Sequence, residues 1–302
     1  MISIRDSKLT LPVAENYPIV MITGDALRHE RFAMRMQAEF SDHILAWLQL
    51  ATAERKVAQD QRSLHNSAKK ARALLSKLLA RRPDRSPPKI YVESALPQFG
   101  SKPSLQTVEQ RLFGKEVEKL RETCTLRPIR VESIESEDTA SRINRLKPYF
   151  ILIFCYPTCI SKLRVCTEGL VLSQDDARTP EYKVDSSVYW ALYHRDLSKI
   201  TSSIRLWPSG TDADFVVRSS TPCFAVDDTV ESCFARQAAL GTEMMCEVVG
   251  DLIKSRTLRL DGYRKIGGAA LDTEPTLDVR RDVESDLRRG LIQRETARKM
   301  RF

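Results

Sequence analysis

The chain has 302 residues, of which 42% are hydrophobic and 29% charged, a balance typical of a globular protein that buries its own core. Its longest apolar runs, such as Phe150 to Phe154, are too short to cross a bilayer. Residues 1–12 lack the continuous apolar core of a signal peptide. We therefore expect a cytoplasmic protein without a membrane partner.

The net charge of +8 raises the question of an anionic partner. Between Lys69 and Arg85 seven basic residues stand against Asp84 alone. We interpret this stretch as a solvated helix face and linker, because charge runs are common on ordinary surfaces. It contains no aromatic residue that could stack on bases, so nucleic acid is not an expected partner.

The cysteines are seven in number and scattered, and no CxxC pair occurs, so we expect no zinc site. Four of them stand among apolar neighbours, where a reduced thiol behaves as a small hydrophobic group. These four are Cys155, Cys159, Cys223 and Cys246.

The N-terminal part reads as the opening of a parallel α/β sheet. Residues 17–23 are apolar and β-branched, which predicts a buried strand. Gly24 and Asp25 then break the strand, and Asp25 is a candidate N-cap for a helix over residues 26–40. Residues 43–50 are expected to form the second strand.

The remaining elements follow from periodicity, capping residues and breakers. Helices are predicted over residues 51–82, 104–123, 136–146, 188–194, 229–252 and 280–289. Ser136 is the expected cap of the third of these helices, and Asp227 and Asp228 are the expected caps of the fifth. Strands are predicted over residues 128–131, 149–154, 170–172, 202–207 and 215–219, with a polar loop over 173–187.

This order predicts an α/β fold with a Rossmann-like, mostly parallel sheet flanked by helices. We assign residues 1–255 to one α/β domain, with a basic helical segment and linker over residues 51–90 inside it. Residues 256–302 are assigned to a short, helical C-terminal extension. The apolar residues of the helix over 229–252 are interpreted as core, although they could also serve an interface.

Four short segments occur in an order and spacing that resemble one family. They are Thr23 to His29, Glu109 to Gly114, Thr179 to Lys183 followed by Tyr189 to Leu192, and Gly210 to Asp214. The chain resembles the folate-dependent formyltransferases. The resemblance is strongest to the short bacterial members, which are related to methionyl-tRNA and sugar N-formyltransferases. It implies the formyltransferase fold from about residue 19 to about residue 292.

That family transfers a formyl group from 10-formyltetrahydrofolate to an amine, and its site uses an Asn-x-His motif and an aspartate. The resemblance places Ser173 on the asparagine, Asp175 on the histidine and Asp212 on the aspartate. Arg205 stands where the family has a second histidine. Two further departures are Val184 and Asp214, which replace glycines.

These replacements predict a site without its usual chemistry. Asp175 brings negative charge to the place where an oxyanion would form, and the loss of one oxyanion donor typically costs roughly 100- to 1,000-fold in rate. We therefore expect a non-catalytic or repurposed protein with no bound cofactor, and a protein partner or a second copy of the chain as its ligand. Arg205 is expected to neutralise Asp175 or Asp212.

Three alternatives stay open. The chain could be an active N-formyltransferase or other acyltransferase on an amine such as an amino sugar, with Asp212 as base, 10-formyltetrahydrofolate as cofactor, and His194 as the nearest replacement histidine. It could be a divalent-metal-dependent enzyme, although no metal-spacing motif supports a ligand set. It could bind anions or nucleic acid through the basic stretch. The aspartates that could gather for the metal are Asp175, Asp176, Asp212 and Asp214. His29 is expected to brace the N-terminal turn.

Overall fold

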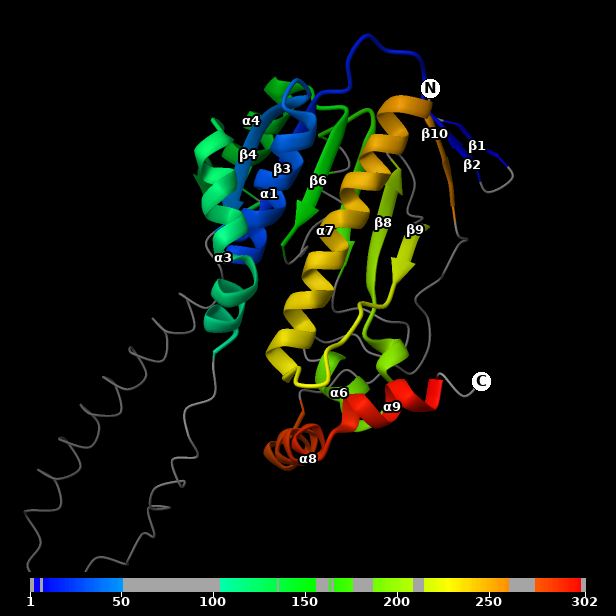
Figure 1. Ribbon diagram of the computed structural model, residues 1–302. Coiled ribbons are helices and arrows are strands. Elements are labelled where there is room, and N and C mark those ends of the chain that lie inside the picture. The colour runs from blue at the N-terminus through cyan, green and yellow to red at the C-terminus, as the bar shows by residue number, and fades with distance from the viewer. Residues whose placement is uncertain are drawn as a thin grey trace, which may run out of the picture. The chain divides into compact units, whose positions relative to one another are not determined.

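The computed structural model describes residues 3–5, 8–50, 104–134, 136–155, 163, 166–175, 187–208, 215–260 and 275–299. Seven of its strands form one sheet in the order β5-β4-β3-β6-β7-β8-β9 (Figure 1). Neighbouring strands are parallel from β5 to β7, and β8 lies antiparallel between β7 and β9. The predicted mostly parallel, Rossmann-like sheet is therefore confirmed. The strands are β3 (Ile19–Thr23), β4 (Ile44–Leu50), β5 (Ile129–Val131), β6 (Phe150–Phe154), β7 (Leu170–Asp175), β8 (Ser202–Pro208) and β9 (Phe215–Ser220).

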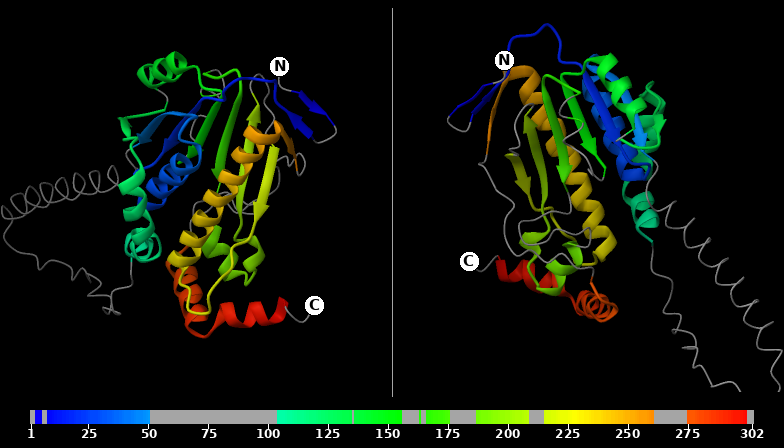
Figure 2. Two further views of the ribbon diagram at one scale, coloured as in Figure 1. Left: turned by 45° about the horizontal axis from the view of Figure 1, so that its top comes forward. Right: turned by 180° about the vertical axis from the view of Figure 1, so that it is seen from behind.

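Helices cover both faces of this sheet (Figure 1, Figure 2). On one face, α1 (Leu27–Phe40) and α7 (Val230–Ser255) pack on the strands, and α3 (Leu105–Thr123) lies against these two helices. On the other face, α4 (Glu137–Leu146) packs on the strands through Ile143. Each face therefore has its own apolar core.

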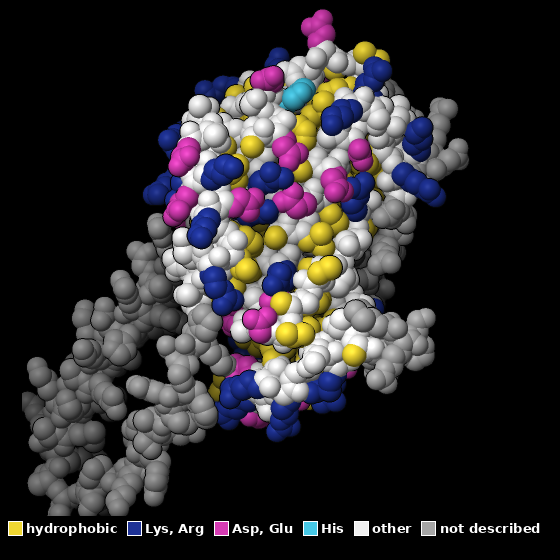
Figure 3. Space-filling view, viewed as in Figure 1, with side chains coloured by type: hydrophobic (Ala, Val, Ile, Leu, Met, Phe, Trp, Pro, Cys, Tyr) yellow, Lys and Arg dark blue, Asp and Glu magenta, His cyan; other side chains and the backbone are white. Residues whose placement is uncertain are grey.

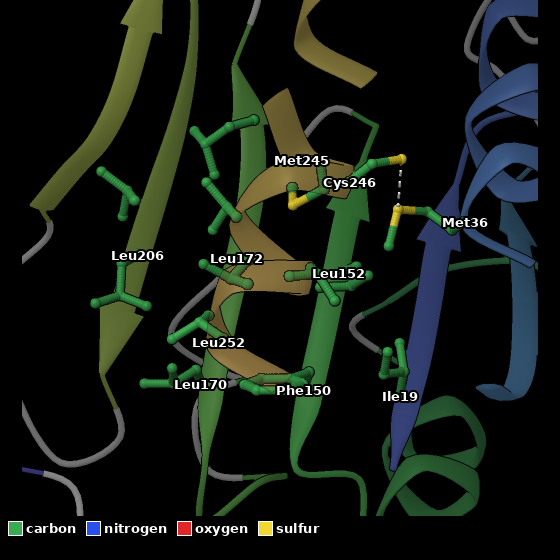
Figure 4. Close-up of a cluster of buried hydrophobic side chains, with 14 of the residues drawn as sticks. Ile19, Met36, Phe150, Leu152, Leu170, Leu172, Leu206, Met245, Cys246 and Leu252 are labelled. Atoms are coloured by element: carbon green, nitrogen blue, oxygen red, sulfur yellow. Dashed lines mark hydrogen bonds between the residues drawn. The ribbon is translucent and has the colours of Figure 1, made fainter. Parts of the chain in front are cut away.

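Alternation along the strands decides which side chains enter which core. On β7, Leu170 and Leu172 point to α7, and Figure 4 shows them beside Met245 and Leu252 of that helix. Val171 belongs to the core on the α4 side. Ser173 and Asp175 continue the Val171 side of the strand, so the candidate site residues lie on the face opposite α7.

The apolar side chains singled out on α7 are core residues. Met244, Met245, Val248 and Val249 are all buried against the sheet. This confirms the interpretation of residues 229–252 as a core helix. No helix among the described residues is both long and apolar enough to span a bilayer.

A small second sheet of three strands was not predicted. It has the order β1-β2-β10 and consists of β1 (Ser3–Arg5), β2 (Lys8–Thr10) and β10 (Thr257–Arg259). Leu9 and Leu258 from this sheet are buried in the core on the α7 side. Strands of three residues are too short to show an alternating pattern, so periodicity does not predict them.

The C-terminal helices share a core with the middle of the chain. Val283 of α8 (Leu277–Arg288) and Leu291 of α9 (Leu291–Lys299) are buried against α6 (Ser187–Tyr193). A short 3₁₀ helix, η1 (Leu197–Lys199), lies between α6 and β8. The domain boundary expected at residue 255 stays a prediction, and the basic segment 51–90 lies outside the described residues.

The caps predicted for two helices were wrong, whereas the Ser136 cap of α4 is confirmed. The N-cap of α1 is Ala26 rather than Asp25, and the N-cap of α7 is Thr229, which forms a capping box with Ser232. Asp228 instead accepts hydrogen bonds from Ala225 N and Ser232 Oγ in front of α7. The side chain nearest in sequence to a helix start is therefore not always the one that caps it.

Two other expectations need correction. Strand β7 does not end at Leu172, where the predicted strand ended. Its next three residues pair with β8, so the strand continues to Asp175. Cys223 is exposed rather than buried in an apolar environment, whereas Cys246 is buried as expected, with its Sγ 3.6 Å from Sδ of Met36 (Figure 4). Cys159 lies outside the described residues.

Candidate functional site

The candidate site residues Ser173 and Asp175 lie at the carboxyl end of β7, beside the first half of β8. In the antiparallel register Ser173 is opposite Arg205 and Asp175 is opposite Ser203. Directly opposed residues point to the same face of a sheet, so all four side chains are neighbours. We call this group, together with Trp207 on the same face, the β7–β8 cluster.

Ser173 is engaged in a buried hydrogen bond. Its side chain is only 2% exposed, and its Oγ accepts from Nε1 of Trp207 at 2.9 Å. An indole nitrogen can only donate, so the serine oxygen must act as acceptor here. By the resemblance, Ser173 stands at the position of an oxyanion donor. Its hydroxyl is buried and is bonded to the indole of Trp207.

Asp175 and Arg205 form a largely buried ion pair. Nε of Arg205 lies 3.2 Å from Oδ2 of Asp175, and the side chains are 5% and 15% exposed. Ser203 Oγ also donates to the main-chain oxygen of Asp175 at 3.3 Å. The hypothesis that Arg205 neutralises Asp175 is confirmed for this pair. Asp212 lies outside the described residues, so its partner stays a prediction.

Neither histidine considered at the sequence level joins the cluster. His29 is buried on α1, where its ring stands edge-on to Phe154 at 4.8 Å between centroids. Phe154 belongs to the core on the α7 side, which is the opposite face from Asp175. His194 is exposed after α6 and stacks on Trp190. The missing histidine of the motif is therefore not replaced by either of them.

The imidazole of His29 is kept neutral by its surroundings. Burial, with a smaller contribution from the nearby Arg28 charge, lowers its pKa well below the usual value. Among the described residues its Nδ1 has no hydrogen-bond partner. His29 thus packs on β6 from the first turn of α1, in agreement with the expected bracing of the N-terminal turn.

The thiols of Cys155 and Cys246 are poor nucleophiles at neutral pH. Burial raises the pKa of Cys155 and that of Cys246 to about 12. A thiol is reactive as the thiolate, which these environments disfavour. Cys155 follows β6 at the same edge of the sheet as Asp175, but its protonated thiol offers no covalent chemistry there.

Two of the resembling segments meet at a second buried site, which we call the α1–α3 junction. Nη1 of Arg28 lies 2.5 Å from Oε1 of Glu109, and the Arg28 main-chain N–H donates to Oε2 of Glu109 at 3.4 Å. The guanidinium also lies over the ring of Phe234 on α7, 5.3 Å from its centroid. The side chain of the N-cap residue Ala26 cannot accept a hydrogen bond from the free N–H groups at the start of α1. The Glu109 carboxylate accepts one of them instead.

A belt of ion pairs continues from this junction along α1, α3 and α7, and Figure 3 shows the alternating charges on this face. Arg31 bonds both Glu116 and Glu243, and Arg35 bonds Glu243 and Glu39. The paired Arg31 and Arg35 lower the pKa of Glu243, although its burial acts in the opposite direction. The belt links the three helices.

Several residues of the predicted site lie outside the described ranges. Within those ranges, no three His, Cys, Asp or Glu side chains gather closely enough to hold a metal ion. The undescribed candidates are Asp176, Thr179 to Lys183, Val184, Asp212 and Asp214.

Sequence reasoning missed two functional neighbours, Trp207 and the role of Glu109. Trp207 stands two residues after Arg205, so period-2 alternation places it on the cluster face. Glu109 was part of a recognised segment, but nothing local shows that it reaches α1, because 81 residues separate it from Arg28.

Comparisons with known proteins give structural likenesses alone. No family model matches the sequence, and no curated protein matches it. The chain is similar to a sugar N-formyltransferase from Shewanella sp. FDAARGOS_354, with 11% identity, 88% of this chain and 86% of that chain covered, and a TM-score of 0.46. It is also similar to phosphoribosylglycinamide formyltransferase from Streptococcus pneumoniae TIGR4, with 14% identity, 79% and 99% coverage and a TM-score of 0.42.

A further solved structure is the N-formyltransferase from Helicobacter canadensis in complex with folinic acid and dTDP-3-aminofucose. The identity is 9%, the coverage is 80% of this chain and 67% of that chain, and the TM-score is 0.40. At these identities and TM-scores, the likeness assigns no activity, substrate or cofactor to this chain.

Proposed function

We propose that this chain is a formyltransferase-like protein that no longer transfers formyl groups and acts as a binding or scaffolding protein. One observation carries the proposal. Both positions of the degenerate Asn-x-His motif are engaged within the sheet, Ser173 by the indole of Trp207 and Asp175 by the guanidinium of Arg205. A site that must stabilise an oxyanion needs donors aimed at it. Asp175 can only accept while it is ionised, and the Ser173 hydroxyl, which keeps its own proton, is buried beside the indole of Trp207.

The residues present do not fit the chemistry of 10-formyltetrahydrofolate. Transfer needs donors aimed at the oxygen of the formyl carbon, together with a group that moves the amine proton. The Ser173 oxygen accepts a hydrogen bond in a buried position, and Asp175 is an acid next to Arg205. We therefore assign no step to the cofactor. The ligand that we propose is a protein partner or a second copy of the chain.

A calorimetric titration of the full chain with 5-formyltetrahydrofolate tests this function. We expect weak or absent binding, because Val184 and Asp214 also replace residues that would be glycines in the resembling loops. Micromolar binding would show that the cofactor site has been kept and would overturn the proposal.

The second candidate is an active N-formyltransferase or other acyltransferase on an amine such as an amino sugar. Two observations favour it. Asp212 stands at the position that resembles the family's aspartate, and the α1–α3 junction joins two of the resembling segments. In this candidate Asp212 would accept the amine proton and 10-formyltetrahydrofolate would supply the formyl group. It predicts turnover that Asp212→Asn abolishes.

A divalent-metal-dependent enzyme is not favoured. Its ligand set would need the Asp175 carboxylate, and Arg205 already neutralises that group. A cation beside the guanidinium would be repelled by it.

A further inference from the structure

The middle residue of Ser173-Gln174-Asp175 points away from the β7–β8 cluster, towards α7. Its side chain is 4% exposed, and its Nε2 donates to the main-chain oxygen of Ala238 at 2.9 Å. This is a hydrogen bond of ordinary length between buried groups. Gln174 therefore ties the end of β7 to α7 on the face behind the cluster.

The same contact requires a glycine on α7. A Cβ added to Gly241 would lie 2.3 Å from Nε2 of Gln174 and 2.3 Å from Oγ of Ser202. Real Cβ atoms do not come so close to other atoms, so α7 can approach the ends of β7 and β8 only because residue 241 has no side chain. Glycine is disfavoured inside helices, which makes its presence here a packing requirement.

A second tie from α7 reaches the start of β8. Gln237, which is fully buried, donates from Nε2 to the main-chain oxygen of Thr201 at 2.6 Å. Thr201 directly precedes β8, and β7 and β8 carry the two halves of the cluster. One helix thus holds both strand ends from the same side.

We infer that α7, through Gln174 and Gly241, positions the strand ends that bring Asp175 to Arg205 and Ser173 to Trp207. Adjacent residues of a strand are rigidly related, so a displacement of Gln174 moves Ser173 and Asp175 relative to β8. Gln174 and Gly241 are positioning residues, because they lie on the α7 side of the sheet and place no side chain in the cluster. The inference does not depend on whether that cluster binds a ligand or transfers a group.

The three tryptophans provide the readout. In full-length protein labelled with ¹⁵N-tryptophan, each indole N–H gives its own NMR signal. The Trp207 signal reports its bond to Ser173, and the Trp47 signal reports a bond to Thr23 Oγ1 at 2.8 Å on the other side of the sheet. Trp47 is therefore an internal control for intact folding.

The variants are Gly241→Ala and, as a matched control in the same helix, Gly250→Ala. A Cβ at position 250 would meet only the ring of Phe40, at 3.7 Å from Cζ and 3.9 Å from Cε1, which are ordinary contacts. We expect Gly241→Ala to shift the Trp207 signal and leave Trp47 in place, and Gly250→Ala to move neither.

Gln174→Met keeps the test decisive if Gly241→Ala does not fold. It preserves the length of the side chain but removes the donor to Ala238, so it should also shift the Trp207 signal while Trp47 stays unchanged. A folded Gly241→Ala protein, or a Gln174→Met protein, whose Trp207 signal is unmoved would overturn the inference.

Discussion

Two buried pairs of an arginine and a carboxylate hold distant parts of this chain together, and they differ in what they join. At the α1–α3 junction, Arg28 and Glu109 link two segments that resemble family motifs. In the β7–β8 cluster, Arg205 and Asp175 stand where the resembling family has histidines. The resemblance therefore matches at the pair that supports the frame and departs at the pair that stands at the expected site.

The comparison predicts the largest loss of stability at the junction. Arg28→Ala leaves Glu109, whose side chain is 2% exposed, without its guanidinium partner. Removing one member of a buried ion pair typically lowers the free energy of unfolding by about 3–5 kcal/mol. Urea unfolding followed by circular dichroism measures this change.

Arg121→Ala is the matched control for the junction. Arg121 also pairs across α1 and α3, with Glu30, but its side chain is 47% exposed. An exposed pair contributes less than about 1 kcal/mol. Equal losses in the two variants would show that burial does not distinguish the junction.

A smaller loss is expected in the cluster. Arg205→Ala removes the guanidinium from Asp175, but that side chain is 15% exposed and can be reached by solvent. We expect the free energy of unfolding to fall by about 1–3 kcal/mol. Arg218→Ala on the neighbouring strand β9 should cost less than about 1 kcal/mol, because its partners Glu247 and Asp251 are mostly exposed.

Restoring a histidine to the cluster sharpens this comparison. Asp175→His sets an imidazole against the guanidinium of Arg205 and removes the carboxylate that neutralises it. The variant should be less stable than the original chain under the same urea titration. An Asp175→His protein of unchanged or higher stability would mean that the Asp175–Arg205 pair does not hold the strands together.

The smallest effect concerns pH and the neutral His29 beside the junction. Its pKa is lowered in the folded state, so the unfolded chain binds a proton first as the pH falls below about 6.5. Stability is therefore lost with falling pH, by up to roughly 1.4 kcal/mol per pH unit below that value. His29→Gln should flatten this part of the stability curve, which urea titrations at several pH values measure.

Much of the fold could be predicted because its core elements carry strong local patterns. The buried strands β3 and β6 read as apolar runs, and α1, α3 and α7 show helical spacing. The three-residue strands of the small sheet carry no such pattern. The end of β7 was missed because Ser173 and Asp175 look like loop residues, and their strand conformation depends on pairing with β8.

The candidate site could be predicted only in part, for a related reason. The charge change at Asp175 and Arg205 was visible in the sequence, and so was the expectation that they would pair. The closure of Ser173 by Trp207 and the placement of Gln174 against Gly241 arise from packing between distant elements. Such contacts leave no periodic signal along the chain.

The claim that the frame is kept while the transfer chemistry is lost is tested most directly by single-turnover mass spectrometry. The full chain is mixed with 10-formyltetrahydrofolate and a panel of amine acceptors that includes amino sugars, with Asp212→Asn in parallel. The account predicts no formylated acceptor from either protein. A formylated product that the original chain forms and Asp212→Asn does not would contradict it.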